Sequence, residues 1–206
     1  MRSILPMLFL CCSVAGASTA SAATLSKTYR YFFIGGVTLP EIEQQLYARG
    51  PRLDSTGQRH PGATRMEFRT RVSYAQDGRR CRIARVSVTV NATITLPKWR
   101  TRHRADEDVR LIWDTLARDI KRHEESHLNI AKNHARQLEE TLKTLPWRRD
   151  CEVLAADAAR TAERVLAEHD AAQARFDRIE AVNFESRMER LLRYRLDQIE
   201  AARSKR

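Results

Sequence analysis

The residues best suited to chemistry lie in the run KRHEESHLNIAKNH, which covers residues 121–134. Within it, His123 and His127 are four residues apart, so on a helix their rings share one face, one turn apart. This spacing lets both imidazoles reach one tetrahedral ion, and it places Glu124 where a carboxylate can take a proton from a bound water. The segment therefore predicts a zinc site with two histidine ligands and Glu124 as the catalytic base.

Both histidines fall on the apolar face of the predicted helix, between Ile120 and Ile130, and so point into the protein. A random chain of this composition would contain the pattern on the order of once in a hundred cases. The alternative is a pair of core histidines whose ring nitrogens bond to other protein groups. Metal binding is our working hypothesis.

A zinc site needs a third protein ligand, and His134 is the next histidine along the chain. A continuous helix carries His134 about 10 Å along the axis from His127, out of reach of the same ion. Metalloproteases that use a third histidine close by first turn the chain at a glycine, and none occurs between these two residues. We therefore predict that His134 packs beside the site or supports a ligand.

The second long helix offers a better third ligand. If the two helices form an antiparallel hairpin about residues 146–150, equal counting from the turn brings His169 to the level of Glu125. His169 also lies on the apolar stripe of its helix and is our predicted third ligand, with Glu168 and Asp170 beside it as alternatives. His169 as an ordinary polar residue on a helix face is the competing interpretation.

Two halves of different composition must position these residues. Residues 28–100 are rich in β-branched and aromatic residues and are interrupted by turn formers. We expect strands within 28–37, 66–74 and 81–97, a short helix over 39–51, and a hairpin turn at residues 75–78. From Ala105 onward the pattern is helical, with a stop at Pro146 and a change of phase near Asn183. The predicted fold class is α+β: a small, mostly antiparallel N-terminal sheet with one short helix, then a long helical hairpin carrying HExxH, and a C-terminal helix.

Residues 1–22 have the anatomy of a secretory signal peptide: one arginine, an apolar stretch, then small residues with an A-x-A site at 20–22. The apolar run is too short for a comfortable membrane span. We therefore predict a mature chain that begins near Ala23, has no stable membrane span, and is periplasmic or secreted. The predicted division is a signal peptide (1–22), the main domain (23–182) and a helical extension (183–206).

Two cysteines remain after cleavage, Cys81 and Cys151. In an oxidising compartment an isolated pair is most simply one disulfide, and two buried free thiols are the alternative. The formal net charge of +11 becomes +10 once Arg2 leaves with the signal peptide. A basic exported protein can meet anionic envelope polymers or acidic substrates, unless the charge is only a compositional habit. Nucleic acid is excluded as a partner by the export signal and by the lack of a basic patch with interleaved aromatic residues.

The order of these features resembles a bacterial family of unknown function described as predicted secreted zinc-dependent proteases. The segments that carry the resemblance are YFFIGGVTLPEIEQQLYARGP, GRRCRIARVSVTVNATITLPKW, HEESHLNIA and the later Cys151. They span about residues 29 to 177. The resemblance implies His123 and His127 as zinc ligands and Glu124 as the catalytic carboxylate, and it implies corresponding roles for Cys81 and Cys151.

The chain departs from that family beyond the second helix, where members carry an aromatic-Asp pair followed by a Thr and a His-Gly. Phe176-Asp177 matches the pair, whereas Glu180, Val182 and Asn183 stand in place of the rest. If the missing histidine is a ligand in the family, then His169, Asp177 or Glu180 replaces it here.

These observations predict an exported zinc-dependent hydrolase, a metallopeptidase that uses a zinc-bound water with Glu124 as general base. Its expected substrate is a peptide or an envelope polymer, and an edge of the N-terminal sheet offers a place to align an extended peptide. The alternatives are a non-catalytic envelope protein with a structural or vestigial metal site, and a periplasmic protein that sequesters zinc.

Overall fold

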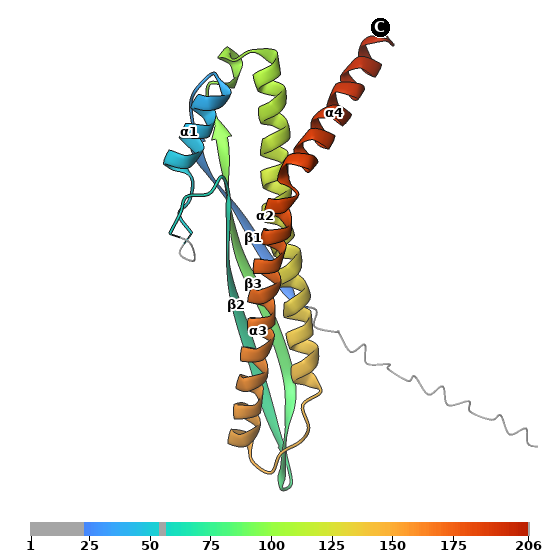
Figure 1. Ribbon diagram of the computed structural model, residues 1–206. Coiled ribbons are helices and arrows are strands. Elements are labelled where there is room, and N and C mark those ends of the chain that lie inside the picture. The colour runs from blue at the N-terminus through green and yellow to red at the C-terminus, as the bar shows by residue number, and fades with distance from the viewer. Residues whose placement is uncertain (1–22, 54–56, 206) are drawn as a thin grey trace, which may run out of the picture.

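The computed structural model describes residues 23–53 and 57–205 of the 206-residue chain, so the predicted signal peptide lies outside the described residues. A three-stranded sheet with one helix comes first and a helical region follows (Figure 1), which confirms the predicted α+β class. The first group comprises β1 (Thr24–Ile34), α1 (Leu39–Arg49), β2 (Ala63–Asp77) and β3 (Arg80–Trp99). The second comprises a short 3₁₀ turn (Arg102–Arg104), α2 (Glu107–Lys143), α3 (Cys151–Val182) and α4 (Phe184–Arg203).

The sheet has the strand order β1-β3-β2. Strands β2 and β3 form an antiparallel hairpin closed at Asp77-Gly78, and Gly78 has the positive φ of 57° that such a turn requires. The predicted hairpin turn is therefore confirmed. Strand β1 pairs parallel to β3, from Thr24 opposite Thr89 to Ile34 opposite Trp99. This direction follows because β2 begins at the end of the sheet where β1 ends, with Ala63 opposite Thr95, and runs back antiparallel to β3.

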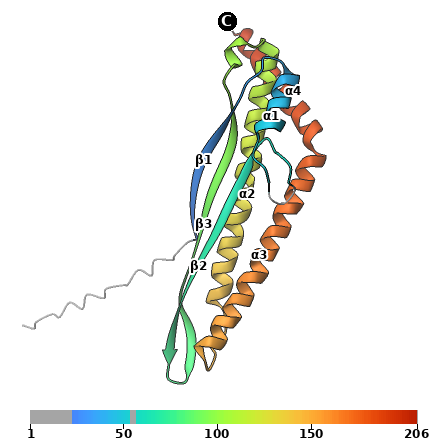
Figure 2. The same cartoon turned by 90° about the vertical axis from the view of Figure 1, so that its left-hand side faces the viewer.

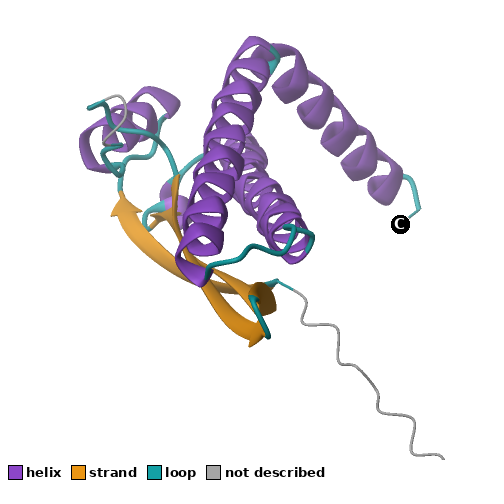
Figure 3. Ribbon diagram, turned by 90° about the horizontal axis from the view of Figure 1, so that it is seen from below, coloured by secondary structure: helices purple, strands orange, loops and turns teal. Residues whose placement is uncertain are grey.

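The central strand β3 is one continuous strand of 20 residues, and its side chains alternate between a buried and a partly exposed face. Its buried residues include Val86, Val88, Val90 and Ile94. Helix α2 packs its own buried stripe, including Leu138 and Leu142, against this face. Figures 2 and 3 show α2 and α3 on the same side of the sheet, so the core lies between one sheet face and the helical hairpin.

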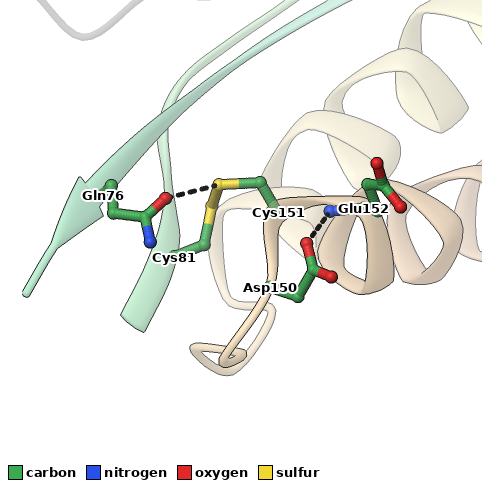
Figure 4. The surroundings of a disulfide bond; sticks show 5 residues. All are labelled: Gln76, Cys81, Asp150, Cys151 and Glu152. Atoms are coloured by element: carbon green, nitrogen blue, oxygen red, sulfur yellow. Dashed lines mark hydrogen bonds between the residues drawn. A yellow bond between two sulfur atoms is a disulfide. The ribbon is translucent and has the colours of Figure 1, made fainter. Parts of the chain in front are cut away.

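The helical hairpin is fixed at its turn by a disulfide between Cys81 on β3 and Cys151 at the start of α3 (Figure 4), as predicted. The Cα atoms of the two cysteines are 5.2 Å apart. Two backbone hydrogen bonds between Cys81 and Arg148 join the same segments. At the first turn of α3 the Asp150 carboxylate accepts a hydrogen bond from the backbone N–H of Glu152 (Figure 4), which caps the helix.

The predicted C-terminal helix is present as α4, which follows α3 after Asn183 (Figure 1). It lies against the first half of α2, where the Arg195 guanidinium donates to the Thr115 hydroxyl and to the carbonyl of Leu111. No residue of α4 is fully buried. Among the described residues, no helix is long and apolar enough to cross a membrane.

Candidate metal centre

The HExxH segment lies midway along α2, where that helix crosses the sheet. Ile120 and Leu128 anchor this part of α2 in a cluster with Ala92, Ile94 and Leu96 of β3. The helical spacing then turns His123 and His127 toward α3, and it turns Glu124 toward the start of β2. Glu124 is buried, with 5 % of its surface exposed, while the two histidines are partly buried.

Asp177 of α3 completes a cluster with the two histidines. The Nε2 atoms of His123 and His127 are 3.1 Å apart, and Asp177 Oδ1 lies 3.4 Å from the first and 3.1 Å from the second. Within the described part of the chain, these are the only three potential metal-ligating side chains that converge in this way. Asp177 was one of the alternatives that the sequence left open for the third ligand.

The donor set fits zinc. Ligand atoms about 2.0 to 2.2 Å from a tetrahedral zinc ion are about 3.3 to 3.5 Å from one another, close to the separations observed here. Two imidazole nitrogens and a carboxylate oxygen, each with a lone pair facing the others, repel unless a cation or a proton lies between them. His123, His127 and Asp177 are therefore the residues that would hold the ion.

Gln173 orients the second of these histidines. Its side-chain oxygen lies 2.6 Å from His127 Nδ1, and because an amide oxygen only accepts, Nδ1 carries the proton and Nε2 presents its lone pair to the cluster. The amide nitrogen of Gln173 donates to the His127 carbonyl (3.1 Å) and to His169 Nε2 (2.8 Å), which fixes the orientation of the amide. Gln173 thus supports a ligand from the neighbouring helix.

The structure does not bring His169 into the converging cluster. His169 is buried with 6 % exposed, its Nδ1 lies 2.9 Å from the Asp170 carboxylate, and its Nε2 accepts from Gln173. Its ring also packs edge-on against Phe68 and His134, at centroid distances of 4.9 and 5.5 Å. Both ring nitrogens are therefore engaged, and His169 stands one hydrogen-bonded residue behind His127.

Helix levels explain this placement. Equal counting from the turn pairs His127 with His169, whereas the structure pairs it with Gln173, one helical turn further along α3. The connection between α2 and α3 runs on past the end of α2 toward the β2–β3 hairpin, where Arg148 pairs with Cys81 (Figure 1). Helix α3 therefore begins further from the HExxH motif than equal counting from the turn supposes. As a result, Asp177, a later residue of α3, lies at the level of the motif.

The other acidic candidates take separate roles. Glu168 accepts hydrogen bonds from Gln137 and Arg164 on the exposed side of the hairpin. The Asp170 carboxylate contacts His169 Nδ1 and lies outside the cluster. Glu180 Oε2 lies 3.6 Å from His123 Nδ1, on the opposite side of that ring from the cluster. Glu180 is thus placed to support His123, as Gln173 supports His127.

An aromatic ring fixes both imidazoles from α3. Phe176 stacks on His123, with ring centroids 5.0 Å apart and planes 28° apart, and meets His127 edge-on at 5.2 Å. These contacts restrict the rotation of both rings, so their Nε2 atoms are held in a fixed arrangement.

Glu124 is held by the beginning of β2. The Thr64 hydroxyl lies 2.8 Å from Glu124 Oε2, to which it donates, and 3.1 Å from the backbone carbonyl of the same residue. A Cβ atom on Gly62 would lie only 2.7 Å from Glu124 Oε1 and 2.9 Å from the side chain of Ile120. Position 62 therefore admits no side chain while Glu124 keeps this conformation. Neither Gly62 nor Thr64 was recognised from the sequence, because both act across 60 residues of chain.

The two carboxyl groups of the site, Glu124 and Asp177, have pKa values shifted in opposite directions. Burial raises the pKa of Glu124 above its usual value, and the Thr64 hydrogen bond and the two histidines offset only part of that rise. Burial also opposes ionisation of Asp177. Without a metal ion, hydrogen bonds from the imidazoles of His123 and His127, which form when Nε2 carries a proton, outweigh burial and hold the pKa of Asp177 well below its usual value. His127 responds in the same way: burial lowers its pKa, and Asp177 and Gln173 more than offset this, so its pKa is raised.

A pocket of about 540 Å³ lies over the cluster. Its walls come from the loop before β2, the first residues of β2, the motif segment of α2, the end of α3 and the start of α4. The wall residues include Leu53, Met66, Ile120, Ala181 and Phe184, which are apolar. A pocket of this size and character suits an organic ligand with apolar side chains.

One signal in the sequence points to Asp177. His169, Gln173 and Asp177 recur every four residues and so lie along a single face of α3, the face that meets the histidines of α2. That stripe identifies the face, but the level along it depends on the connection between the helices.

Comparison with known proteins gives one match. No curated protein and no solved structure matches the chain. A family profile described as a bacterial protein of unknown function, DUF922, matches residues 29–184, from β1 to the first residue of α4. The matched region contains the HExxH segment, both cysteines and Asp177. Because this match covers most of the chain, the chain belongs to the DUF922 family of bacterial proteins of unknown function.

Proposed function

We propose that this protein is an exported zinc-dependent hydrolase that cleaves peptide bonds. The observation that carries the proposal is the convergence of His123 Nε2, His127 Nε2 and Asp177 Oδ1 at spacings suited to tetrahedral zinc, beside the buried carboxylate of Glu124. Three protein ligands leave a fourth position open, as catalytic zinc sites require and structural sites do not.

Zinc, when bound, supplies Lewis acidity, which makes water a stronger acid and polarises a carbonyl group. Glu124 supplies the proton transfer. Its Oε2 is occupied by the Thr64 hydroxyl, so Oε1 is the atom that takes a proton from the attacking water and returns it to the leaving amine. The raised pKa of Glu124 supports this role, because a carboxyl group must hold the proton between the two transfers.

The pocket supports a peptide with a bulky apolar side chain next to the bond that is cut. Its volume of about 540 Å³ leaves room for a side chain such as that of leucine or phenylalanine beside the reacting group. Met66, Ile120 and Phe184 would contact that side chain and remove apolar surface from water.

Export rests on two features that support each other. The N-terminal residues have the pattern of a signal peptide, and Cys81 and Cys151 form a disulfide, which persists in oxidising compartments and is rare in the reducing cytosol. We therefore infer a periplasmic or secreted location.

Metal content of the purified chain from Ala23 onward tests the site. Elemental analysis should find about one zinc per chain in the wild type, and zinc should be lost in His123→Ala and in Asp177→Ala. Zinc should be retained in His169→Ala, in contrast to a site that uses His169 as its third ligand. A wild type that binds no zinc when the ion is supplied contradicts the proposal.

Glu124→Gln separates an enzyme from a metal-binding protein. This variant keeps the shape of the side chain but cannot accept a proton, so it should bind zinc as the wild type does and hydrolyse no peptide. A library of peptides with apolar residues gives the assay. Hydrolysis that persists in Glu124→Gln contradicts the role of this carboxylate. Zinc binding without hydrolysis in the wild type instead supports sequestration or a structural site.

A further inference from the structure

Four charged side chains form a continuous network next to the metal centre. The Arg187 guanidinium of α4 grips the Asp119 carboxylate of α2, with its Nε 3.1 Å from Oδ1 and its Nη2 3.1 Å from Oδ2. Arg187 Nη2 also lies 3.3 Å from Glu180 Oε2 on α3. Arg122 of α2 bonds the same two carboxylates, Asp119 at 2.9 Å and Glu180 at closer range. Two carboxylates and two guanidinium groups thus alternate across the three helices.

The network is shielded from solvent around Arg187. The exposed fractions are 4 % for the Asp119 side chain, 15 % for Arg187 and 16 % for Glu180. Because burial costs an unpaired charge several kcal/mol, these groups depend on one another. Arg187 also lines the pocket, but its donors are directed to Asp119, to Glu180 and to the Glu180 carbonyl, so it does not serve as a free site for a substrate carboxylate.

The network is connected to both halves of the metal centre. Asp119 lies one helical turn before His123 on α2, and Glu180 lies three residues after Asp177 on α3. Glu180 Oε2 faces His123 Nδ1 at 3.6 Å, so it favours the tautomer whose Nε2 lone pair is directed to the cluster. The network therefore places a carboxylate next to the Nδ1 atom of one ligand and joins the two helices that carry the ligands.

We propose that Arg187 is a positioning residue of the metal centre, and that α4 contributes to the site through this residue. This inference rests on the zinc site proposed above and adds to it a residue beyond the family match, which ends at Phe184. Arg187 acts by holding Glu180 against His123 and by joining Asp119 of α2 to Glu180 of α3. Its donors go to Asp119 and Glu180 and not to the ligand nitrogens.

Zinc affinity of Arg187→Gln, measured by competition with a chromophoric chelator, tests this role. Loss of a group that orients a ligand lowers metal affinity about 10- to 100-fold, and that is the expected drop. The visible spectrum of the cobalt-loaded variant should also change, because the ligand geometry is no longer fixed. Arg187→Lys should recover only part of the affinity, since one ammonium cannot reach both carboxylates as a planar fork does. Arg193→Gln, an exposed arginine on the same helix, is the matched control and should bind zinc as the wild type does.

Arg187→Gln leaves the buried Asp119 charge with Arg122 alone, so we expect the variant to lose stability for a reason unrelated to zinc. The double variant Asp119→Asn/Arg187→Gln removes that unpaired charge. Its metal-free form should regain most of the wild-type melting temperature, while its zinc affinity stays low because Glu180 still lacks its contact with Arg187. Zinc affinity that recovers together with stability overturns the proposal.

A cycle with Glu180→Gln identifies the path. If Arg187 acts through Glu180, adding Arg187→Gln to Glu180→Gln lowers zinc affinity no further, so the two losses do not add. Fully additive losses overturn the proposed path, and an affinity of Arg187→Gln within about twofold of the wild type overturns the role itself. A wild type that binds no zinc is the separate failure of the proposed function.

Discussion

At the scale of single residues, the site depends on a contact that only the absence of a side chain permits. Glu124 is a buried carboxylate beside two imidazoles, and its conformation is set by the hydroxyl of Thr64 on one oxygen and by the bare backbone of Gly62 beside the other. Gly62 is needed here for close approach, since its φ is not in the left-handed region. The contacts come from the first residues of β2 and the residue before it, so this segment positions Glu124 while α2 positions the two histidines.

Gly62→Ala should displace the Glu124 carboxylate while leaving the zinc ligands in place. The new Cβ would lie 2.7 Å from Oε1, so the carboxylate must move. A shift of about 1 Å in a catalytic group can cost about 100-fold in rate, and we expect kcat/KM for peptide hydrolysis to fall by about that factor with zinc content unchanged. Gly35→Ala is the control, because nothing lies within 4 Å of a Cβ there. Equal activity of the two variants would contradict the contact.

Thr64→Val should move the acid limb of the activity profile to higher pH. Glu124 must be ionised to accept a proton, so activity falls as the pH drops through its pKa, which burial already raises. The Thr64 hydrogen bond stabilises the ionised form, and its removal raises that pKa further. The pH dependence of kcat/KM measures the shift, with Thr93→Val on the far face of β3 as control. A limb that moves to lower pH would contradict this assignment.

At the scale of the elements, α3 presents a functional stripe to α2. His169, Gln173 and Asp177 follow one another at four-residue intervals, and each takes a different position relative to His127: behind it, beside it and opposite it. The packing of His169 against Phe68 of β2 connects this stripe to the sheet. These contacts therefore hold His127 in a fixed position relative to the core.

His169→Phe should weaken zinc binding without abolishing it. The substituted ring keeps the contact with Phe68 but cannot accept the hydrogen bond that orients Gln173, so His127 is held less firmly. We expect a zinc stoichiometry of about one per chain and an affinity lower by up to about tenfold, the effect of losing an outer support. Isothermal titration of the metal-free protein measures both. Complete loss of zinc would instead make His169 a ligand.

At the scale of the whole molecule, the turn of the helical hairpin and its motif region have different roles. The turn end is joined to β3 by the Cys81–Cys151 disulfide and by the backbone pairing of Cys81 with Arg148. The metal centre lies about 30 Å away along α2, since Glu125 precedes Leu145 by twenty residues. Stability and metal binding are therefore separable by mutation.

Replacing both cysteines, as Cys81→Ser/Cys151→Ser, should lower stability and leave the site intact. The bridge closes a separation of 70 residues, and its loss should cost about 2 to 4 kcal/mol, or about 5 to 15 °C in melting temperature. Thermal unfolding followed by circular dichroism measures the loss. Zinc affinity should stay within about threefold of the wild type. A large loss of affinity would show that the turn, too, controls the metal centre.

Local patterns in the sequence determined a large part of this protein. The alternation of Val86, Val88 and Val90 made β3 a strand with one buried face, Asp77-Gly78 made a hairpin turn, and the four-residue spacing of His123 and His127 placed both imidazoles on one helix face. Each of these follows from backbone geometry within a few residues. The pairing of two cysteines was also accessible, because no other cysteine remains in the described chain.

Only the tertiary structure decided which side chain meets the histidines from α3. The helical period identifies the face that carries His169, Gln173 and Asp177, but the level along that face depends on how far the connection at Arg148 runs before α3 begins. The predicted ligand His169 and the converging Asp177 are eight residues apart on that face, about two turns of helix. Gly62 and Arg187 reach the site from the residue before β2 and from α4, and no local rule relates their positions to the motif. Local chemistry thus fixed the two histidines and the base, and the packing of β2, α3 and α4 on α2 fixed what surrounds them.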